Sequence, residues 1–324
     1  MATENIPVHE IPAANALRRG LSRWRLIAFV ALAIAIVAIG GRFALERNKG
    51  DEAHIARVEI TGVIATDRSR LAALEALADD ENVKAVIIAI NSPGGTAAGG
   101  EELYEALSVV RAQKPVVAVI RELGASAAYM TAIGADHIFA RRLSIVGSIG
   151  VLIQHVNASK LFNTIGIEFD KVQTGPLKAE PDIDDPLTGA ARVSLQALVD
   201  DSYHWFVDVV AERREIERDS VLSLSDGRII TGRMALDLRL IDAIGGEHEA
   251  IIWLEESKDV ATELPVLTHY PWPQSSIELF LDRIGGKAIN NVLANLGIGT
   301  RAGLSSTNAL DGLVSLWQAG GSER

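Results

Sequence analysis

Two short segments rich in small residues stand where buried strands are expected to end, and both offer groups that acyl-transfer chemistry uses. Ser126 lies in GASAAYM (124–130), just after the apolar run PVVAVI and two charged residues. Small neighbours let another backbone approach the serine, and a helix that begins here presents unpaired N–H groups to a developing oxyanion. A serine that merely caps an alanine-packed helix fits the same pattern, so the local sequence leaves both interpretations open.

The second segment, NSPGG (91–95), follows the continuous apolar run VKAVIIAI. Gly94 and Gly95 offer backbone N–H groups of the kind that form an oxyanion hole, although a tight turn uses paired glycines equally well. In an open parallel sheet, ligands bind beyond the carboxyl ends of the strands. Two small-residue turns at two such ends therefore favour a site there.

A serine nucleophile also needs a base. Among the seven histidines, His155 is the best imidazole candidate, but no orienting carboxylate is obvious beside it. Lys178 is the other candidate, in the loop TGPLKAEPDIDDP (174–186), where an isolated lysine would ordinarily be a solvated surface residue. A lysine acts as a base only when uncharged, so its pKa of ~10.4 must fall to near 7–8 in an enclosed apolar site.

Composition and absent motifs narrow the remaining chemistry. The 324 residues are 48% hydrophobic and 23% charged, as in an ordinary folded chain. A net charge of -11 without a basic stripe argues against a nucleic acid partner. The chain has no cysteine, which excludes a cysteine nucleophile, a disulfide framework and cysteine-ligated metals. No HExxH, EF-hand or phosphate-binding glycine motif is present, so we expect neither metal nor cofactor.

The elements that must position these residues alternate between strand and helix. Apolar and β-branched runs predict strands at 55–64, 83–90, 115–120, 137–140 and 144–153, and helical spacing predicts helices at 68–80, 100–113, from 124, and over 187–217. This alternation predicts an α/β fold with a parallel sheet and right-handed crossovers. We expect the catalytic domain to span 54–257, and 258–324 to be an accessory segment with helix over 277–299.

The N-terminal region contains a membrane candidate. Residues 26–41 are uncharged, and as a helix they cover ~24 Å of a ~30 Å hydrocarbon core. With Trp24 and Phe43 at the interfaces, we predict a transmembrane anchor over 26–43, preceded by a cytoplasmic tail over 1–25. A cleaved signal peptide and a buried soluble helix are the alternatives.

From about residue 55 to about 256, the order and spacing of several segments resemble the bacterial signal peptide peptidase A family, which are membrane-anchored serine proteases with a Ser–Lys dyad. The matching segments are the SPGG turn, the small-residue helix opening before Tyr129, GADHIFA, GSIGV (147–151), GPLK, VDDSYHWFVDVVAERR and DGRIITGRMALDLRLIDAIGG. The family's wording near the nucleophile is closer to AASGGYYIA, whereas this chain has GASAAYMTA, with alanines in place of glycines.

Carried over by motif, the resemblance implies that Ser126 is the nucleophile and Lys178 the general base. Ser148 matches the serine that holds the lysine, and the N–H groups around Gly94 and Gly95 match the oxyanion hole. The implied fold is similar to that of Clp protease subunit P and crotonase, a wound β-superhelix with outer helices. Members of this family assemble into rings or domes.

For the whole chain, the resemblance implies a peptidase that degrades cleaved signal peptides and other short or unfolded membrane-associated polypeptides. We expect it in the bacterial inner membrane, bound to the bilayer through 26–43, with the peptidase domain on the extracytoplasmic side. We also expect a homo-oligomeric ring in which serine and lysine come from neighbouring copies. The alternatives are a Ser–His peptidase that uses Ser126 and His155, a crotonase-like acyl-CoA enzyme, and an inactive scaffold of the same fold.

Overall fold

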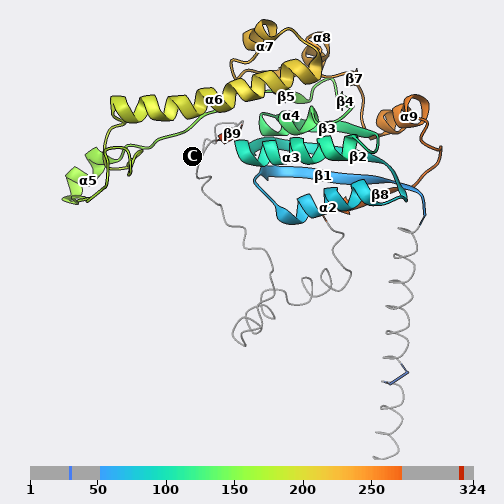
Figure 1. The fold of residues 1–324 in the computed structure, drawn as a ribbon, viewed down its shortest axis with the longest axis horizontal. Coiled ribbons are helices and arrows are strands. Elements are labelled where there is room, and N and C mark those ends of the chain that lie inside the picture. The colour runs from blue at the N-terminus through green and yellow to red at the C-terminus, as the bar shows by residue number, and fades with distance from the viewer. Residues whose placement is uncertain (1–28, 31–51, 272–313, 317–324) are drawn as a thin grey trace, which may run out of the picture. The chain divides into compact units, whose positions relative to one another are not determined.

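A computed structural model describes residues 29–30, 52–271 and 314–316 (Figure 1). The chain divides into two compact units, 1–52 and 53–324. Among the described residues, no helix is long and apolar enough to cross a bilayer. The expected anchor over 26–43 lies, apart from the helical pair Phe29 and Val30, outside the described residues and stays a prediction.

One mixed sheet forms the centre of the second unit. Its main path runs β6-β5-β3-β2-β1-β8, while β4 pairs with β3 and β7, and β9 pairs with β2. The strands are β1 (His54–Ile64), β2 (Val83–Thr96), β3 (Val116–Ala125), β4 (His137–Ala140), β5 (Ile145–Gly147), β6 (Ile229–Thr231), β7 (Ala243–Ile244), β8 (Val266–Tyr270) and β9 (Val314–Leu316). The pairs β1–β2 and β2–β3 are parallel, as the strand–helix alternation predicts, whereas β5–β6 and β2–β9 are antiparallel.

Helices on both faces bury the central strands. Successive side chains of a strand point to opposite faces, so β2 sends Val86, Ile88 and Ile90 into one apolar core and Ala85 and Ile87 into another. The larger core takes its helical side chains from α2, α3, α4, α6, α7 and α8, and the smaller one from α9. Burial on both faces explains why these strands are continuous apolar runs.

Side-chain caps mark the start of several helices, because the first N–H groups of a helix need partners outside it. Asp67, Thr96 and Thr188 accept from the first turns of α2, α3 and α6. The helices are α2 (Arg68–Asp79), α3 (Ala97–Arg111), α4 (Ala127–Ala132), α5 (Ser159–Ile165), α6 (Gly189–Arg214), α7 (Arg218–Leu224), α8 (Gly232–Asp237) and α9 (Glu247–Ser257).

Two of the expected elements are shorter than the sequence pattern indicates. The strand expected over 144–153 ends at Gly147, because Gly147 (φ 94°) and Ser148 (φ 51°) leave the extended conformation. The helix expected from 124 begins at Ala127, because 124–125 still belong to β3 and pair with β5. Both corrections fall on the strand ends that carry the candidate site.

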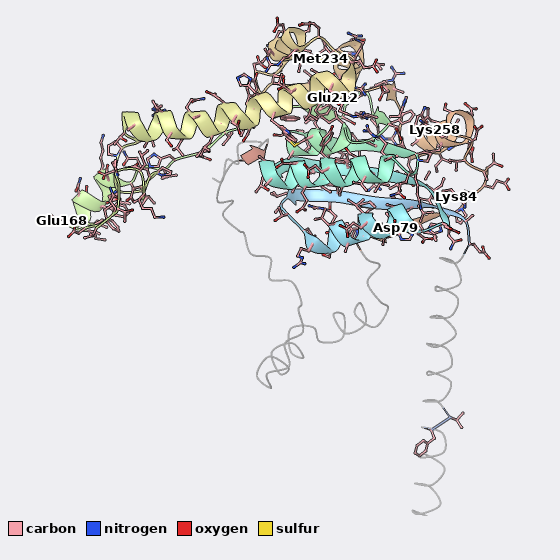
Figure 2. All side chains as sticks on the ribbon, viewed as in Figure 1. Asp79, Lys84, Glu168, Glu212, Met234 and Lys258 are labelled. Carbon is pink, nitrogen blue, oxygen red and sulfur yellow. The ribbon has the colours of Figure 1, made fainter. Side chains whose placement is uncertain are left out.

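Residues 152–200, called the arm below, lie between β5 and the middle of α6. In Figure 1, α5 and the first half of α6 project away from the sheet, and Figure 2 labels Glu168 at the outer end. Helix α5 has no buried residue, and four of the five buried residues of α6 lie beyond residue 205. The helix expected over 187–217 is therefore present, but it packs on the core mainly through its second half.

Candidate active site

Three strand ends meet where the sequence predicts a site. Near its end, β2 pairs Ser92 with Gly124 of β3, and β3 in turn pairs Ala125 with Gly147 of β5. Because all three strands are parallel here, their carboxyl ends lie at the same edge of the sheet. The residue that follows each strand end, or the turn within it, is one of the sequence-predicted site residues.

Ser126 has a backbone conformation that side chains rarely adopt, with φ 59° and ψ -123°. Its N–H donates to the carbonyl of Gly147 at 2.8 Å, and its side chain makes no capping hydrogen bond to α4. Such a conformation costs on the order of 1–3 kcal/mol and is concentrated at functional sites. The structure therefore disfavours the interpretation that Ser126 is only a helix cap.

Helix α4, which begins directly after Ser126, is fixed by burial and by hydrogen bonds. All six residues of the helix are buried. The hydroxyl of Tyr129 donates to the carbonyl of Leu240 at 2.7 Å, and its burial raises the pKa of the phenol. At the other end, the guanidinium of Arg213 donates to the carbonyls of Ile133 and Ala135 at 2.9 and 2.8 Å. Contacts at both ends leave the nucleophile candidate little room to shift.

The turn at Gly94 and Gly95 is supported by a residue that the sequence analysis did not single out. Ser92 is fully buried, its hydroxyl donates to the carbonyl of Gly62 at 2.6 Å, and it accepts from the N–H of Gly94 at 3.1 Å. Gly94 has φ 101°, and a Cβ on Gly95 would lie 1.7 Å from the carbonyl oxygen of Ile64. The tendency of serine to hydrogen-bond the backbone two residues on was the available sequence signal.

The same turn is also a pairing edge for extended chain. Strand β9 lies antiparallel to it, with Gly94 opposite Leu316, Gly95 opposite Ser315 and Thr96 opposite Val314. An extended segment can therefore add to β2 directly beside the end of β3.

Ser148 belongs to the same junction. It follows Gly147, the residue whose carbonyl accepts from Ser126, and its own N–H donates to the carbonyl of Arg228 at 2.7 Å. It is 8% exposed and has a positive φ of 51°. The structure thus brings Ser126, Ser148 and the turn at 94–95 together within one chain.

Lys178 lies elsewhere. It is an exposed residue of a turn in which its N–H donates to the carbonyl of Gly175 at 3.1 Å. That turn belongs to segment 166–188, which joins α5 to α6 in the arm, and α5 and α4 stand well apart in Figure 1. Within the described chain, the structure does not bring Lys178 to Ser126.

His155 and two charged residues stabilise the arm. A ring nitrogen of His155, Nε2, lies 2.7 Å from the carbonyl oxygen of Asp182, so that nitrogen carries the proton and donates. The ammonium of Lys171 donates to the carboxylate of Asp182 at 2.7 Å and lowers the pKa of that carboxyl to about 2. His155 therefore acts as a structural donor in the arm. The described residues contain no group of side chains suited to hold a metal ion.

Comparisons with known proteins show which family the chain resembles. The family described as Peptidase family S49 matches residues 108–261. The relative slr0021 of Synechocystis sp., named as a candidate protease, is 39% identical over 201 residues, covering 61% of this chain and 72% of the relative.

A second relative and a solved structure extend the comparison. An Enterococcus faecium protein, named as a candidate signal peptide peptidase SppA, is 29% identical over 218 residues, which is 63% of each protein, so the chain spans less than two thirds of its length. The solved S97A mutant of the 1510-N membrane-bound stomatin-specific protease has a TM-score of 0.44 and 14% identity, over 67% of this chain and 97% of that one.

Proposed function

Because the chain belongs to peptidase family S49 and is a serine peptidase, we propose that Ser126 is its nucleophile. The observation that carries the proposal is the strained Ser126, buried at the junction of three strand ends and without a capping role. A nucleophile on a turn with unusual φ and ψ presents its hydroxyl in a direction that a regular strand or helix would not allow.

The hydrogen bonds around the glycine turn refine the expected oxyanion hole. Since the N–H of Gly94 already donates to Ser92, we assign the oxyanion donor to Gly95 and the support of the turn to Gly94. Loss of one such donor typically costs about 10²–10³ in kcat.

The base in this proposal is Lys178, oriented by the hydroxyl of Ser148. In the acylation step, the Ser126 hydroxyl oxygen bonds to the scissile carbonyl carbon while the neutral Lys178 amine takes the hydroxyl proton. The lysine then returns this proton to the leaving amine as the peptide C–N bond breaks. Water repeats the sequence on the acyl-enzyme and regenerates Ser126. His155 is the weaker candidate, because its Nε2 is committed to the carbonyl of Asp182.

The placement of Lys178 supports a dyad formed between neighbouring copies. A lysine acts as a base only in its uncharged form, which an enclosed apolar site favours, so the exposed Lys178 needs a covering surface. The arm offers such a contact, because many of its apolar side chains are exposed and large exposed apolar patches mark interaction sites. These are Leu152, Val156, Leu161, Ile165, Ile167, Phe169, Val172, Leu177, Ile183, Val193 and Leu198. We therefore propose a homo-oligomeric ring built on the wound β-superhelix of the resemblance.

The proposed substrate is an extended peptide. The antiparallel pairing of β9 with Gly94–Thr96 supports binding by strand addition, in which main-chain hydrogen bonds supply affinity. The relative named for signal peptides supports short membrane-associated polypeptides as the substrate class. An anchor over 26–43 would hold the domain at the outer face of the inner membrane.

Covalent labelling tests the nucleophile. A fluorophosphonate probe reacts with an activated serine, so we expect it to label the wild-type protein and not Ser126→Ala. Ser108→Ala is the matched control, because Ser108 lies on α3 and its hydroxyl donates to the carbonyl of Tyr104. Labelling of Ser126→Ala at the wild-type rate would contradict the assignment.

A further inference from the structure

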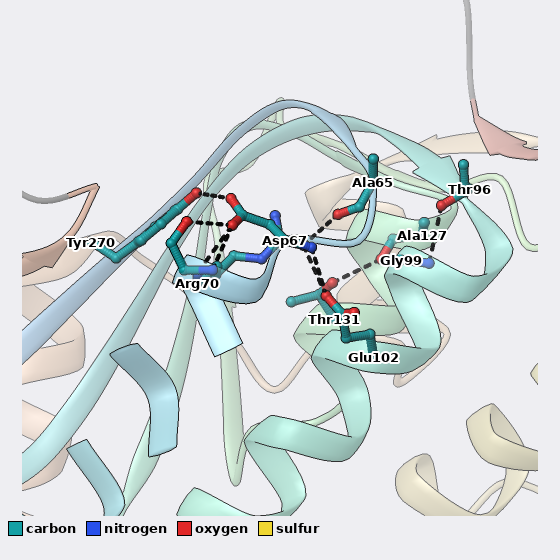
Figure 3. Close-up of polar contacts among 10 residues, drawn as sticks. Ala65, Asp67, Arg70, Thr96, Gly99, Glu102, Ala127, Thr131 and Tyr270 are labelled. Atoms are coloured by element: carbon teal, nitrogen blue, oxygen red, sulfur yellow. Dashed lines mark hydrogen bonds and ion pairs between the residues drawn. The ribbon is translucent and has the colours of Figure 1, made fainter. Parts of the chain in front are cut away.

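A partly buried polar cluster contacts Ala65, the residue that follows the end of β1. Arg70, in the first turn of α2, is 6% exposed, and its Nη2 donates to the carbonyl of Ala65 at 2.6 Å. The same nitrogen lies 3.6 Å from Oε1 of Glu102 on α3, and that oxygen accepts from the N–H of Asp67 at 3.0 Å. Figure 3 shows the cluster, called the clamp below and defined as Asp67, Arg70, Glu102 and Tyr270.

Asp67 links the clamp to the edge of the sheet. Its carboxylate accepts from the N–H groups of Ser69 and Arg70 at 2.9 and 3.2 Å, and from the hydroxyl of Tyr270 of β8 at 2.5 Å. Burial raises the pKa of Asp67, but the hydrogen bonds from Ser69, Tyr270 and Arg70 outweigh it and lower the value to about 2. The carboxylate is therefore ionised at any pH at which a peptidase of this kind would work.

What the clamp holds is the end of β1. Val63 and Ile64 pair with Gly94 and Gly95, the residues of the oxyanion turn. A Cβ on Gly95 would lie 1.7 Å from the carbonyl oxygen of Ile64, so the backbones approach as closely as glycine permits. Any movement of the end of β1 is passed directly to Gly95.

The clamp also fixes the other side of that turn. Helix α3 begins at Ala97, directly after the turn, and a Cβ on Gly99 would lie 2.9 Å from the carbonyl carbon of Ala65. Arg70 contacts Ala65 and Glu102 at once, so it ties the segment before the turn to the helix after it.

Stability alone is a weak reason for this arrangement. The Nε of Arg70 is buried and has no hydrogen-bond partner among the described residues, and an unsatisfied buried donor destabilises a fold. Well-packed apolar residues are often more stabilising than a buried ion pair. An oxyanion donor, by contrast, must lie about 2.7–3.1 Å from the oxyanion, so small displacements matter.

Resting on the proposed function, we propose that Arg70, held by Asp67 and Glu102, is a positioning residue that sets the Gly95 N–H for the transition state. It acts through Ala65 and Ile64 and touches no substrate. Its loss should weaken binding of the oxyanion while leaving ground-state peptide binding unchanged.

The test compares variants of the full-length protein. Arg70→Met keeps the length of the side chain without its charge, and we expect it to lower kcat by about 10–100-fold with KM within about threefold, because removal of a whole donor costs about 10²–10³. Arg70→Lys should recover part of kcat, since an ammonium still donates to Ala65. Glu101→Gln, an exposed neighbour on α3, is the matched control and should leave kcat unchanged.

A second readout separates positioning from general damage. A peptide aldehyde forms a tetrahedral adduct with an oxyanion, and its affinity should fall by the same factor as kcat in Arg70→Met. Affinity for an uncleaved peptide, measured in a Ser126→Ala background, should not change. If Arg70→Met does not fold, Glu102→Gln keeps the shape of the clamp and should show a smaller loss in the same two quantities.

Two outcomes would overturn the inference: an unchanged kcat in folded Arg70→Met, or aldehyde and ground-state peptide affinities that fall together. Neither would touch the nucleophile assignment, because the fluorophosphonate experiment reports on Ser126 independently. Loss of that assignment would appear instead as labelling of Ser126→Ala.

Discussion

Around Ser126 the backbone is fixed by strand pairing and by packing. Strand β3 pairs with β2 and β5, and every residue of α4 is buried. Around Lys178 the chain is held by exposed turns, by the ion pair of Lys171 with Asp182 and by the ring of His155. The first region keeps its geometry through its own packing. The second leaves apolar side chains exposed, and in the proposed ring a neighbouring copy would cover them. The difference teaches that the proposed nucleophile is preorganised within each chain, whereas the proposed base would become competent only in the proposed assembly.

The largest effect should come from removing either member of the proposed dyad. We expect Ser126→Ala and Lys178→Ala each to lower kcat for a fluorogenic peptide by at least about 10³-fold, because removing a serine nucleophile or its base costs about that much or more. Circular dichroism and the melting temperature should change little, since neither side chain fills the core. Lys160→Ala, an exposed lysine of the arm, is the matched control and should remain active. An active Lys178→Ala protein would reject the dyad.

Mixing the two inactive variants tests whether the regions act across copies. If serine and lysine come from neighbouring protomers of a closed ring, equal amounts mixed at random restore about a quarter of the sites, since half of the protomers keep each group. The measurement is peptidase activity after subunit exchange, with exchange followed by fluorescent labels on both variants. Complete exchange without activity would locate the dyad within one chain.

A smaller effect is expected at the histidine of the arm. Because His155 donates to a backbone carbonyl, His155→Gln retains a donor and should lower kcat less than about tenfold, whereas loss of a general base costs about 10²–10⁴-fold. The pH–rate profile of both proteins should rise to an alkaline plateau. A thousandfold loss would favour an imidazole mechanism.

We expect the smallest effect from replacing one of two carboxylates, Asp67 in the sheet region or Asp182 in the arm. The pKa of each is lowered to about 2. In the sheet region, Asp67 loses its stabilising charge as pH falls from about 4 through 2, so Asp67→Asn should lower the melting temperature by about 2–4 °C above pH 4 and by progressively less as the pH falls to 2. In the arm, Asp182→Asn should leave the main transition unchanged, because its contact with Lys171 is exposed. Scanning calorimetry between pH 2 and 7 gives both results, and equal shifts would mean that the arm melts as part of the core.

Local sequence patterns predict much of the sheet region, because its signals are short in range. Apolar runs indicate β1, β2 and β3, and glycine-rich turns indicate their ends. The family resemblance points to Ser126, but only the structure shows its positive φ and the absence of a cap. These depend on the pairing of Ala125 with Gly147, which no local pattern encodes.

The contacts that escaped sequence reasoning join residues far apart in the chain. Ser92 bonds to Gly62, thirty residues away, and Tyr270 to Asp67 across more than two hundred. The exposure of the arm could not be predicted from the sequence for a different reason. Its apolar spacing is that of a core helix, and the sequence does not say whether the covering surface lies in the same molecule.

The antiparallel pairing of β9 with Gly94–Thr96 has a kinetic consequence for any peptide that binds in the same way. Strand addition uses the backbone N–H and C=O groups of the bound peptide, so a peptide folded as a helix must first unfold. When opening is fast relative to cleavage, the rate follows the equilibrium population of the open form. Each 1.4 kcal/mol by which a peptide favours its helix would then slow its cleavage about tenfold, whatever its side chains. Such an enzyme would rank its substrates by their local unfolding equilibria.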